Sequence, residues 1–241
     1  MTLGDLDALR LAAEDALFLD FDGTLAEIGP DPDAVRIPDA TSADVAALGA
    51  SLGGAVAIVS GRDLRDLAKR TPDAVWRAGA HGLETLAPGA APAAAAPEAD
   101  PAVLAALAQV AAIDGVRIER KGPVTAIHFR AAPEAGPDCL AAATRAAASA
   151  PEHVAQPGKM VVEVKPKAAN KGAALRAFLA AAPFAGRRPV MIGDDRTDED
   201  AIAVALEFGG VGVKIGEGET AAPLRAPSPA ALRAWLAREA G

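Results

Sequence analysis

The sequence predicts an α/β protein with a doubly wound, Rossmann-like parallel-sheet core and an inserted α+β cap domain. Three observations carry this prediction: short apolar runs that end at polar or glycine-rich turns, helical patterns between the runs, and a Pro/Ala-rich break in mid-chain. Continuous apolar runs suit strands that are buried on both faces of a parallel sheet. Strands that alternate with helices are typical of a doubly wound core.

The apolar runs and helical patterns give the expected elements of the core. We predict strands over residues 16–19, 55–59, 190–192 and 211–215. We predict helices over residues 63–70, 171–181, 198–208 and 229–238.

The mid-chain break separates this core from a second unit. Residues 87–101 read APGAAPAAAAPEADP, which has the turn character of a domain boundary or, alternatively, of a plain surface loop. A helix pattern, a strand pair, another helix pattern and a strand at 160–164 follow the break. We therefore expect residues 1–87 and 166–241 to form the larger core and residues 88–165 to form the inserted unit, the cap.

The composition excludes some classes of binding partner and indicates the cellular compartment of the protein. The 241 residues are 51% hydrophobic and carry a net charge of −8, which disfavours nucleic acid and anionic membranes as partners. Cys139 is the single cysteine, so no intramolecular disulfide can form. The first residues, MTLGDLDALRLAAEDA, lack the pattern of a signal peptide, and no apolar stretch is long enough to span a membrane. We expect a cytoplasmic protein.

The stretch ALFLDFDGTLAEI places two carboxylates, Asp20 and Asp22, at the end of the first apolar run. Ligands of open parallel sheets bind beyond the carboxyl ends of the strands, so both acids are expected in a crevice. Two close carboxylates repel each other, and Mg²⁺ between them would relieve that repulsion. One carboxylate can then attack phosphorus while the other transfers protons. Gly23 would permit the turn, and Thr24 would offer donors to an anion.

Distant segments supply matching partners for the two acids. Ser60 and Gly61 in IVSGR follow the second apolar run and can hold a phosphate oxygen, although a helix cap is an equal reading. The segment MIGDDRTDED carries five acids within seven residues from Asp194. Helix capping explains the later acids of this segment, whereas a metal explains Asp194 and Asp195 better. Lys171 in NKG supplies a cation at a predicted helix start.

These four motifs, in this order, resemble those of the haloacid-dehalogenase-like phosphatase superfamily. Over nearly its whole length the chain resembles the trehalose-6-phosphate phosphatase family. The segments that carry this likeness are LDFDGTL, SGR, GAHGLE, IERK…HFR, GKMVVEVKP, NKG, GDDRTDED, GVKIGEG and the PLRAPSPAALRAWL tail.

The resemblance implies a Mg²⁺-dependent phosphatase that hydrolyses trehalose 6-phosphate through an aspartyl phosphate, the last step of trehalose biosynthesis. It implies that Asp20 is the nucleophile and a metal ligand, and that Asp22 is the general acid/base and binds Mg²⁺ through its backbone carbonyl. Thr24, Ser60 and Gly61 would bind the phosphate, and Lys171 would neutralise it. Asp194 would complete the metal shell, with Asp195 and Asp198 in it or close by. A functional link to a trehalose-6-phosphate synthase is compatible with this reading.

The resemblance also implies a sugar-binding set, mostly in the cap. Its members are Arg62, His81, Glu84, Glu119, Lys121, Arg130, Lys159 and Glu163. Alternation along strands places Glu119 with Lys121, and Lys159 with Glu163, on shared faces. Without the resemblance, these would be surface ion pairs worth less than about 1 kcal/mol.

One departure from the family pattern and two rival functions remain. Ala168 stands where the family usually has glycine, and a positive φ there would cost about 1 kcal/mol. One rival is a phosphatase for another sugar phosphate, such as sucrose phosphate, glucosylglycerol phosphate or a phosphoglycerate glycoside. The other is an inactive domain that binds a sugar phosphate and regulates a synthase.

Overall fold

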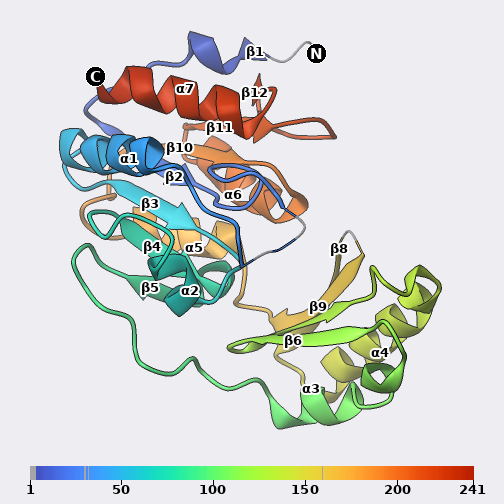
Figure 1. Ribbon diagram of the computed structural model, residues 1–241. Helices are drawn as coiled ribbons and strands as arrows, with labels where there is room; N and C mark the ends of the chain where they lie inside the picture. The colour runs from blue at the N-terminus through green and yellow to red at the C-terminus, as the bar shows by residue number, and fades with distance from the viewer. Residues whose placement is uncertain (1–3, 30, 32, 159) are drawn as a thin grey trace. The chain divides into compact units, whose positions relative to one another are not determined.

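The computed structural model describes residues 4–29, 31, 33–158 and 160–241 and divides the chain into two compact units (Figure 1). The core unit comprises Met1–Pro92 and Asn170–Gly241, and the cap unit comprises Ala93–Ala169. The core is thus built from two chain segments, with the cap inserted between them.

The core unit contains an eight-stranded sheet in the order β1-β12-β11-β10-β2-β3-β4-β5. All neighbouring strands are parallel except the antiparallel pair β4 and β5. The strands are β1 (Gly4–Asp5), β2 (Asp15–Leu19), β3 (Val56–Val59), β4 (Trp76–Gly79), β5 (Glu84–Leu86), β10 (Arg188–Gly193), β11 (Val211–Ile215) and β12 (Leu224–Ala226). The central strand β2 is buried along its whole length, as its unbroken apolar run predicts.

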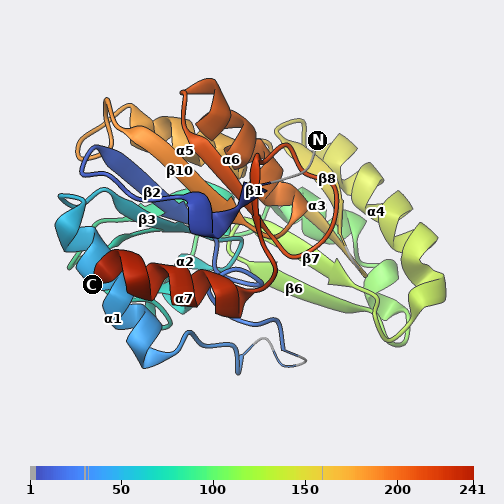
Figure 2. The same ribbon diagram turned by 90° about the horizontal axis from the view of Figure 1, so that it is seen from above.

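Helices cover both faces of this sheet, which confirms the doubly wound fold class. They are α1 (Asp39–Ser51), α2 (Leu64–Ala68), α5 (Lys171–Leu179), α6 (Arg196–Glu207) and α7 (Pro229–Ala240), with the short 3₁₀ helices η1 (Leu6–Ala8) and η2 (Ala80–Gly82). Leu17 and Leu19 of β2 pack in one apolar cluster with residues of α1 and α7, which lie side by side in Figures 1 and 2. Phe18 of β2 packs in a second cluster with residues of α5 and α6.

The cap unit is an antiparallel sheet in the order β6-β7-β9-β8 with helices packed on one face. Its elements are α3 (Pro101–Ala106), η3 (Val110–Ala112), β6 (Arg117–Lys121), β7 (Val124–His128), η4 (Pro133–Ala135), α4 (Gly136–Ser149), β8 (His153–Gly158) and β9 (Val161–Pro166). Ile127, Val162 and Val164 of the sheet form an apolar cluster with residues of α3 and α4. Cys139 is buried in that cluster, as a small apolar residue would be.

Several elements lie outside the sequence predictions. Helix α1 and strands β1, β4, β5, β8 and β12 were not among the expected elements, and most of them are short or lie toward an edge of a sheet. Ala168 does not adopt a positive φ. Within the described ranges, the non-glycine residues that do so are Ala80, His81 and Met160. Alanine in place of glycine therefore carries no backbone strain there. Of the helices that the structure describes, none is both long and apolar enough to cross a membrane.

Candidate active site

The candidate site lies at the carboxyl edge of the core sheet. Asp20 directly follows β2, Ser60 directly follows β3, and Asp194 directly follows β10. Since these three strands are parallel neighbours, their carboxyl ends meet at one edge. Residues that are far apart in the sequence are thereby gathered in one place.

A buried lysine joins two of the acids. Lys171 Nζ donates hydrogen bonds to Asp20 Oδ1 at 2.6 Å and to Asp198 Oδ1 at 2.7 Å. All three side chains are buried, with Lys171 only 3% exposed. Asn170 caps α5 by accepting from the backbone N–H of Ala173, which places Lys171 at the first position of the helix. The strand end and the helix start thus hold opposite charges in contact.

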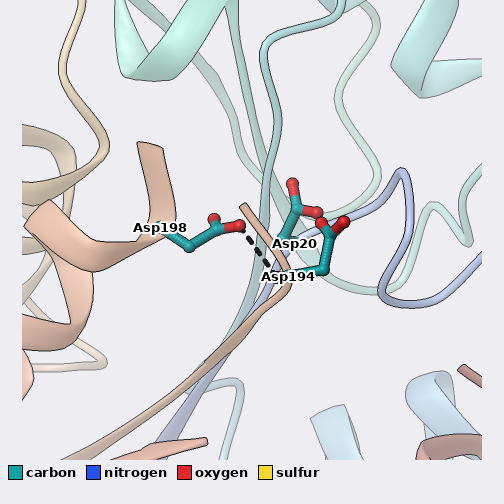
Figure 3. A group of neighbouring side chains, drawn as sticks. All are labelled: Asp20, Asp194 and Asp198. Atoms are coloured by element: carbon teal, nitrogen blue, oxygen red, sulfur yellow. Dashed lines mark hydrogen bonds between the residues drawn. The ribbon is translucent and has the colours of Figure 1, made fainter. Parts of the chain in front are cut away.

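Three carboxylates converge at this edge, as Figure 3 shows. Asp20, Asp194 and Asp198 each offer an oxygen, and these three oxygens lie within 4.8 Å of one another. Carboxylate oxygens are the ligands that Mg²⁺ prefers, so the donor set fits a hard divalent cation. Asp195 and the Asp22 side chain lie outside this group of three.

The turn before α6 fixes Asp198 in this group. Asp198 Oδ2 accepts from the backbone N–H groups of Asp194 and Asp195, both at 3.1 Å (dashed for Asp194 in Figure 3). Asp195 caps α6 in return, because its Oδ1 accepts from the N–H groups of Thr197 and Asp198. Gly193 is required here, since a Cβ would lie 2.2 Å from Asp198 Cγ. Both oxygens of Asp198 are therefore engaged, so it chiefly supports Asp194 and Lys171.

Burial and mutual repulsion shape the protonation of the cluster. Burial raises the pKa of Asp20 to about 7 against the opposing pull of Lys171, and burial with repulsion from Asp198 and Asp195 raises the pKa of Asp194 to about 6. Burial likewise raises the pKa of Asp198. Burial disfavours the Lys171 ammonium, yet Asp198 and Asp20 outweigh it and raise the pKa of Lys171. The cluster holds more negative charge than one lysine neutralises, and a bound cation would relieve that excess.

A tight turn after Asp20 carries the next residues of the motif. Gly23 N–H donates to Ala26 at 2.8 Å, and Gly23 adopts a φ of 78° that favours glycine. A Cβ on Gly23 would lie 2.2 Å from Asp194 Oδ2, so glycine at this position also permits the close approach of Asp194. Thr24 is buried, with its Oγ1 3.5 Å from Asp194 Oδ1.

The Asp22 side chain meets Arg62, a pairing that the sequence does not reveal. Arg62 Nε donates to Asp22 Oδ2 at 2.8 Å and Arg62 Nη2 donates to Asp22 Oδ1 at 2.6 Å. Arg62 Nη1 also donates to Asp66 of α2. Arg62 therefore contacts a second acid of the motif, in addition to the sugar-binding role that the family resemblance implies.

The SGR turn packs against the GAHG segment. Buried Ser60 accepts at Oγ from the Arg62 N–H at 3.1 Å, and the N–H of His81 donates to the Ser60 carbonyl at 2.9 Å. The His81 ring lies so close to Gly61 that a Cβ there would be 2.7 Å from His81 Cε1. Glu84 pairs with Arg65 of α2. The structure thus brings His81 and Gly61 together.

In the cap unit, a network of charged groups covers the face of the sheet opposite to the helices. Lys121 Nζ lies 3.4 Å from Glu163 Oε1 and 3.9 Å from Glu119 Oε2, so three predicted residues come together. His128 Nε2 lies 2.7 Å from Glu119 Oε2, and this hydrogen bond lowers the pKa of Glu119. Arg130 is exposed in the turn after β7. Lys159, which the sequence places with Glu163, lies outside the described residues.

Two site residues escaped the sequence reasoning. Lys214 of β11 is buried and donates from Nζ to the backbone carbonyl of Asp194. Its signal is a lone lysine within the apolar run VGVKI, at the end of a central strand. The second residue is His128 of β7, which strand alternation places opposite Arg117 and on the same face as Glu119.

The core unit has the fold of haloacid-dehalogenase-like proteins. A haloacid dehalogenase-like hydrolase from Bacteroides thetaiotaomicron has this fold, with a TM-score of 0.66 at 14% identity over 93% of this chain and 98% of that one. The C-terminal domain of the C. albicans trehalose-6-phosphate phosphatase gives a TM-score of 0.78 at 23% identity over 95% and 92%.

Sequence comparison identifies the family within this class. Residues 18–230 match the family model described as Trehalose-phosphatase, and this chain belongs to that family. The chain is 39% identical over 234 residues to the trehalose-6-phosphate phosphatase of Escherichia coli (strain K12). The matched region covers 94% of this chain and 87% of the relative. The chain is accordingly a phosphoric monoester hydrolase.

Proposed function

We propose that this protein is a Mg²⁺-dependent phosphatase that hydrolyses trehalose 6-phosphate through an aspartyl phosphate on Asp20. The observation that carries the proposal is the buried contact of Lys171 with Asp20 and Asp198, beside the converging oxygen of Asp194. A carboxylate at a strand end, with a fixed cation and a cation-binding acid beside it, suits attack on a phosphoryl group. The expected cytoplasmic location and the link to a synthase stay predictions.

The acid group would hold the metal ion. Asp20 and Asp194 would bind Mg²⁺ directly, with the backbone carbonyl of Asp22 as a further ligand, while Asp198 and Asp195 would hold the turn around it. When bound, the cation supplies positive charge that neutralises the phosphoryl oxygens and the excess charge of the carboxylates. Burial raises the pKa of Asp20 to about 7, and a cation bound beside Lys171 would favour the ionised carboxylate that the attack requires.

The chain's own residues account for both halves of the reaction. Asp20 attacks phosphorus, the bond from phosphorus to the sugar oxygen breaks, and Asp22 gives its proton to the leaving oxygen. Water then attacks the aspartyl phosphate and gives a proton to Asp22, which releases phosphate and restores the Asp20 carboxylate. Thr24, Ser60 and the N–H of Gly61 would orient the phosphoryl oxygens, and Lys171 would neutralise one of them.

Rapid acid quench of the enzyme with labelled trehalose 6-phosphate tests this chemistry. We expect Mg²⁺-dependent phosphate release and a base-labile protein phosphate, both absent in Asp20→Asn and in chelator. Asp200→Asn is a matched control, because that acid lies outside the three-carboxylate group and binds the Asn170 side chain instead. A base-stable phosphoenzyme, or one that persists in Asp20→Asn, would refute the aspartyl-phosphate route.

We assign sugar recognition to the charged face of the cap sheet. Glu119, Lys121 and Glu163 are linked there by ion pairs, with Arg130 and Lys159 as further candidates from the same segments. His81, Glu84 and Arg62, which belong to the core unit, stay sugar-binding predictions from the family resemblance. A site built from such polar groups rejects a sugar that leaves them unpaired.

The substrate panel tests this assignment. Glu119→Ala and Glu163→Ala should raise KM for trehalose 6-phosphate far more than KM for p-nitrophenyl phosphate. Glu134→Ala, an exposed cap residue in η4, serves as the control and should change neither value. Preference of the wild type for another sugar phosphate would leave the chemistry intact and overturn the assignment of the cap. Equal effects on both substrates would do the same.

A further inference from the structure

Both oxygens of the Asp22 carboxylate are bound by a single guanidinium group. Arg62 uses Nε for Oδ2 and Nη2 for Oδ1, at 2.8 and 2.6 Å. This two-point geometry fixes the plane of a carboxylate as well as its position, because the guanidinium is a rigid planar fork. A lysine or a single hydrogen bond could not do this.

Arg62 is itself held more firmly than its partner. The Arg62 side chain is 11% exposed, whereas the Asp22 side chain is 37% exposed. Arg62 Nη1 donates to Asp66 Oδ2 at 2.8 Å, and the guanidinium carbon lies 5.2 Å from the centre of the Phe21 ring. The more exposed Asp22 carboxylate is therefore oriented by the more buried Arg62 guanidinium group.

The anchoring continues away from Asp22 through alternating charges. Arg70 donates to Asp66 from Nε at 2.7 Å, and Arg70 Nη1 donates to the backbone carbonyl of Val35 at 2.8 Å. Asp66 is thus bound by two arginines, one of which is tied to the backbone of a distant segment. The row Asp22–Arg62–Asp66–Arg70 connects the turn after β2 with α2.

We propose that Arg62 is a positioning residue for Asp22 in proton transfer. A general acid works only within hydrogen-bond reach of the atom it protonates, and a side chain on a partly exposed turn would otherwise sample other rotamers. In the acid form of Asp22, one oxygen keeps its bond to Arg62 while the other, which has released Arg62, carries the proton. As the sugar oxygen leaves phosphorus, that proton passes from Asp22 to the sugar oxygen. Arg62 stays charged throughout, and the returning proton comes from the attacking water. The inference rests on the proposed function of Asp22.

Leaving-group dependence separates positioning from a merely structural role. Arg62→Met keeps the aliphatic stem and removes the fork. We expect its kcat for trehalose 6-phosphate to fall by about 10- to 100-fold, the order expected when a catalytic group is misplaced by about 1 Å. The first-turnover burst of p-nitrophenol from p-nitrophenyl phosphate should change by less than about 3-fold, because that leaving group needs no proton. Arg62→Lys, which keeps the charge without the fork, should lose part of the sugar-phosphate rate.

A double-mutant cycle with Asp22→Asn provides the second readout. If Arg62 acts through Asp22, the double variant should be no slower than Asp22→Asn alone, since coupled residues are not additive. Arg176→Met is the matched control. Arg176 also donates from two nitrogens to one carboxylate, that of Glu207, and its guanidinium carbon lies 5.8 Å from the centre of the Phe208 ring. Its effects should be small and additive with Asp22→Asn.

Other outcomes would overturn the inference. If Arg62→Met lowers the rates with trehalose 6-phosphate and p-nitrophenyl phosphate equally, Arg62 has only a structural role. The same follows if the double variant is slower by the product of the two single effects. A raised KM with unchanged kcat makes it a substrate-binding residue only. If Asp22→Asn keeps the wild-type kcat, the proposed role of Asp22 is wrong and the inference falls with it. If Asp22→Asn is impaired but the double variant is slower still, the positioning role of Arg62 is wrong, whereas the proposed role of Asp22 stands.

Discussion

Replacing Lys171 by methionine should destabilise the metal-free protein strongly. Lys171 is 3% exposed and its ammonium contacts two buried carboxylates at 2.6 and 2.7 Å. Methionine keeps much of the volume but leaves Asp20 and Asp198 without their cation. Removing one partner of a buried ion pair costs about 3–5 kcal/mol.

The loss can be read as a melting temperature and should depend on pH. For a chain of this size about 1 kcal/mol shifts Tm by roughly 2–4 °C, so we expect a fall of about 6–20 °C in chelator at pH 8. Burial raises the pKa of Asp20 to about 7 even though Lys171 lowers it, so loss of the lysine leaves Asp20 with an ionisation penalty that is absent near pH 4 and still grows between pH 7 and pH 8. The loss should therefore be smaller at pH 5.5 than at pH 8.

Thermal unfolding followed by circular dichroism decides the matter. Lys69→Met, at an exposed lysine after α2, is the control and should shift Tm by less than about 2 °C. Mg²⁺ should restore part of the loss in Lys171→Met, because it supplies charge to the same carboxylates. If Lys171→Met at pH 8 in chelator melts no lower than the control, the account of a charge-excess cluster is wrong.

Three further outcomes follow from the two units. Mg²⁺ should raise Tm more at pH 8 than at pH 5.5, because burial lifts the pKa of Asp20 to about 7 and protons then compete with the cation; equal shifts in scanning fluorimetry would contradict this. Thr125→Val should raise the free energy of unfolding in urea by about 1 kcal/mol, since the buried Thr125 Oγ1 has no hydrogen-bond partner within the described ranges; a loss would show that the hydroxyl is satisfied. Gly23→Ala should abolish turnover, because a Cβ would meet Asp194 at 2.2 Å, whereas Gly216→Ala, also at positive φ but facing open space, should cost about 1–2 kcal/mol of stability and keep kcat; similar kcat values would refute the steric argument.

The central strands could be predicted because their residues are apolar on both faces. Strand β2 and its neighbours β3 and β10 read as unbroken apolar runs, and their carboxyl ends carry Asp20, Ser60 and Asp194. The meeting of these residues therefore follows from the parallel topology. The predicted fold class is confirmed by the likeness to a solved haloacid dehalogenase-like hydrolase.

Other elements give weak local signals. Helix α1 reads DATSADVAALGAS, in which alanine and polar residues blur any apolar stripe, and it takes its place by packing Val45 and Leu48 into the core. Strands β5 and β12 are too short for a period of two to be recognised. Such segments are set by the neighbours that they pair with.

Side-chain pairings between loops lie beyond sequence reasoning for a different reason. Arg62 and Asp22 belong to the turns after two different strands, and their contact depends on the rotamers and twist of both. The same holds for His128 with Glu119, which meet across a hairpin. Spacing places these residues on a face or at an edge, but only the folded backbone selects the partner.

The interrupted core has a consequence for synthesis on the ribosome. Strand β2 and Asp20 are made early, but the neighbouring strand β10, which pairs Val190 with Leu17, is made only after the whole cap. Until then one side of this largely apolar strand lacks its partner strand, and such edges are prone to aggregation. We expect the cap, whose strands and helices are contiguous in the chain, to fold first while the core waits. Lys171 and Asp194 arrive in that same late segment, so the acidic cluster cannot assemble on a nascent chain before β10 is made.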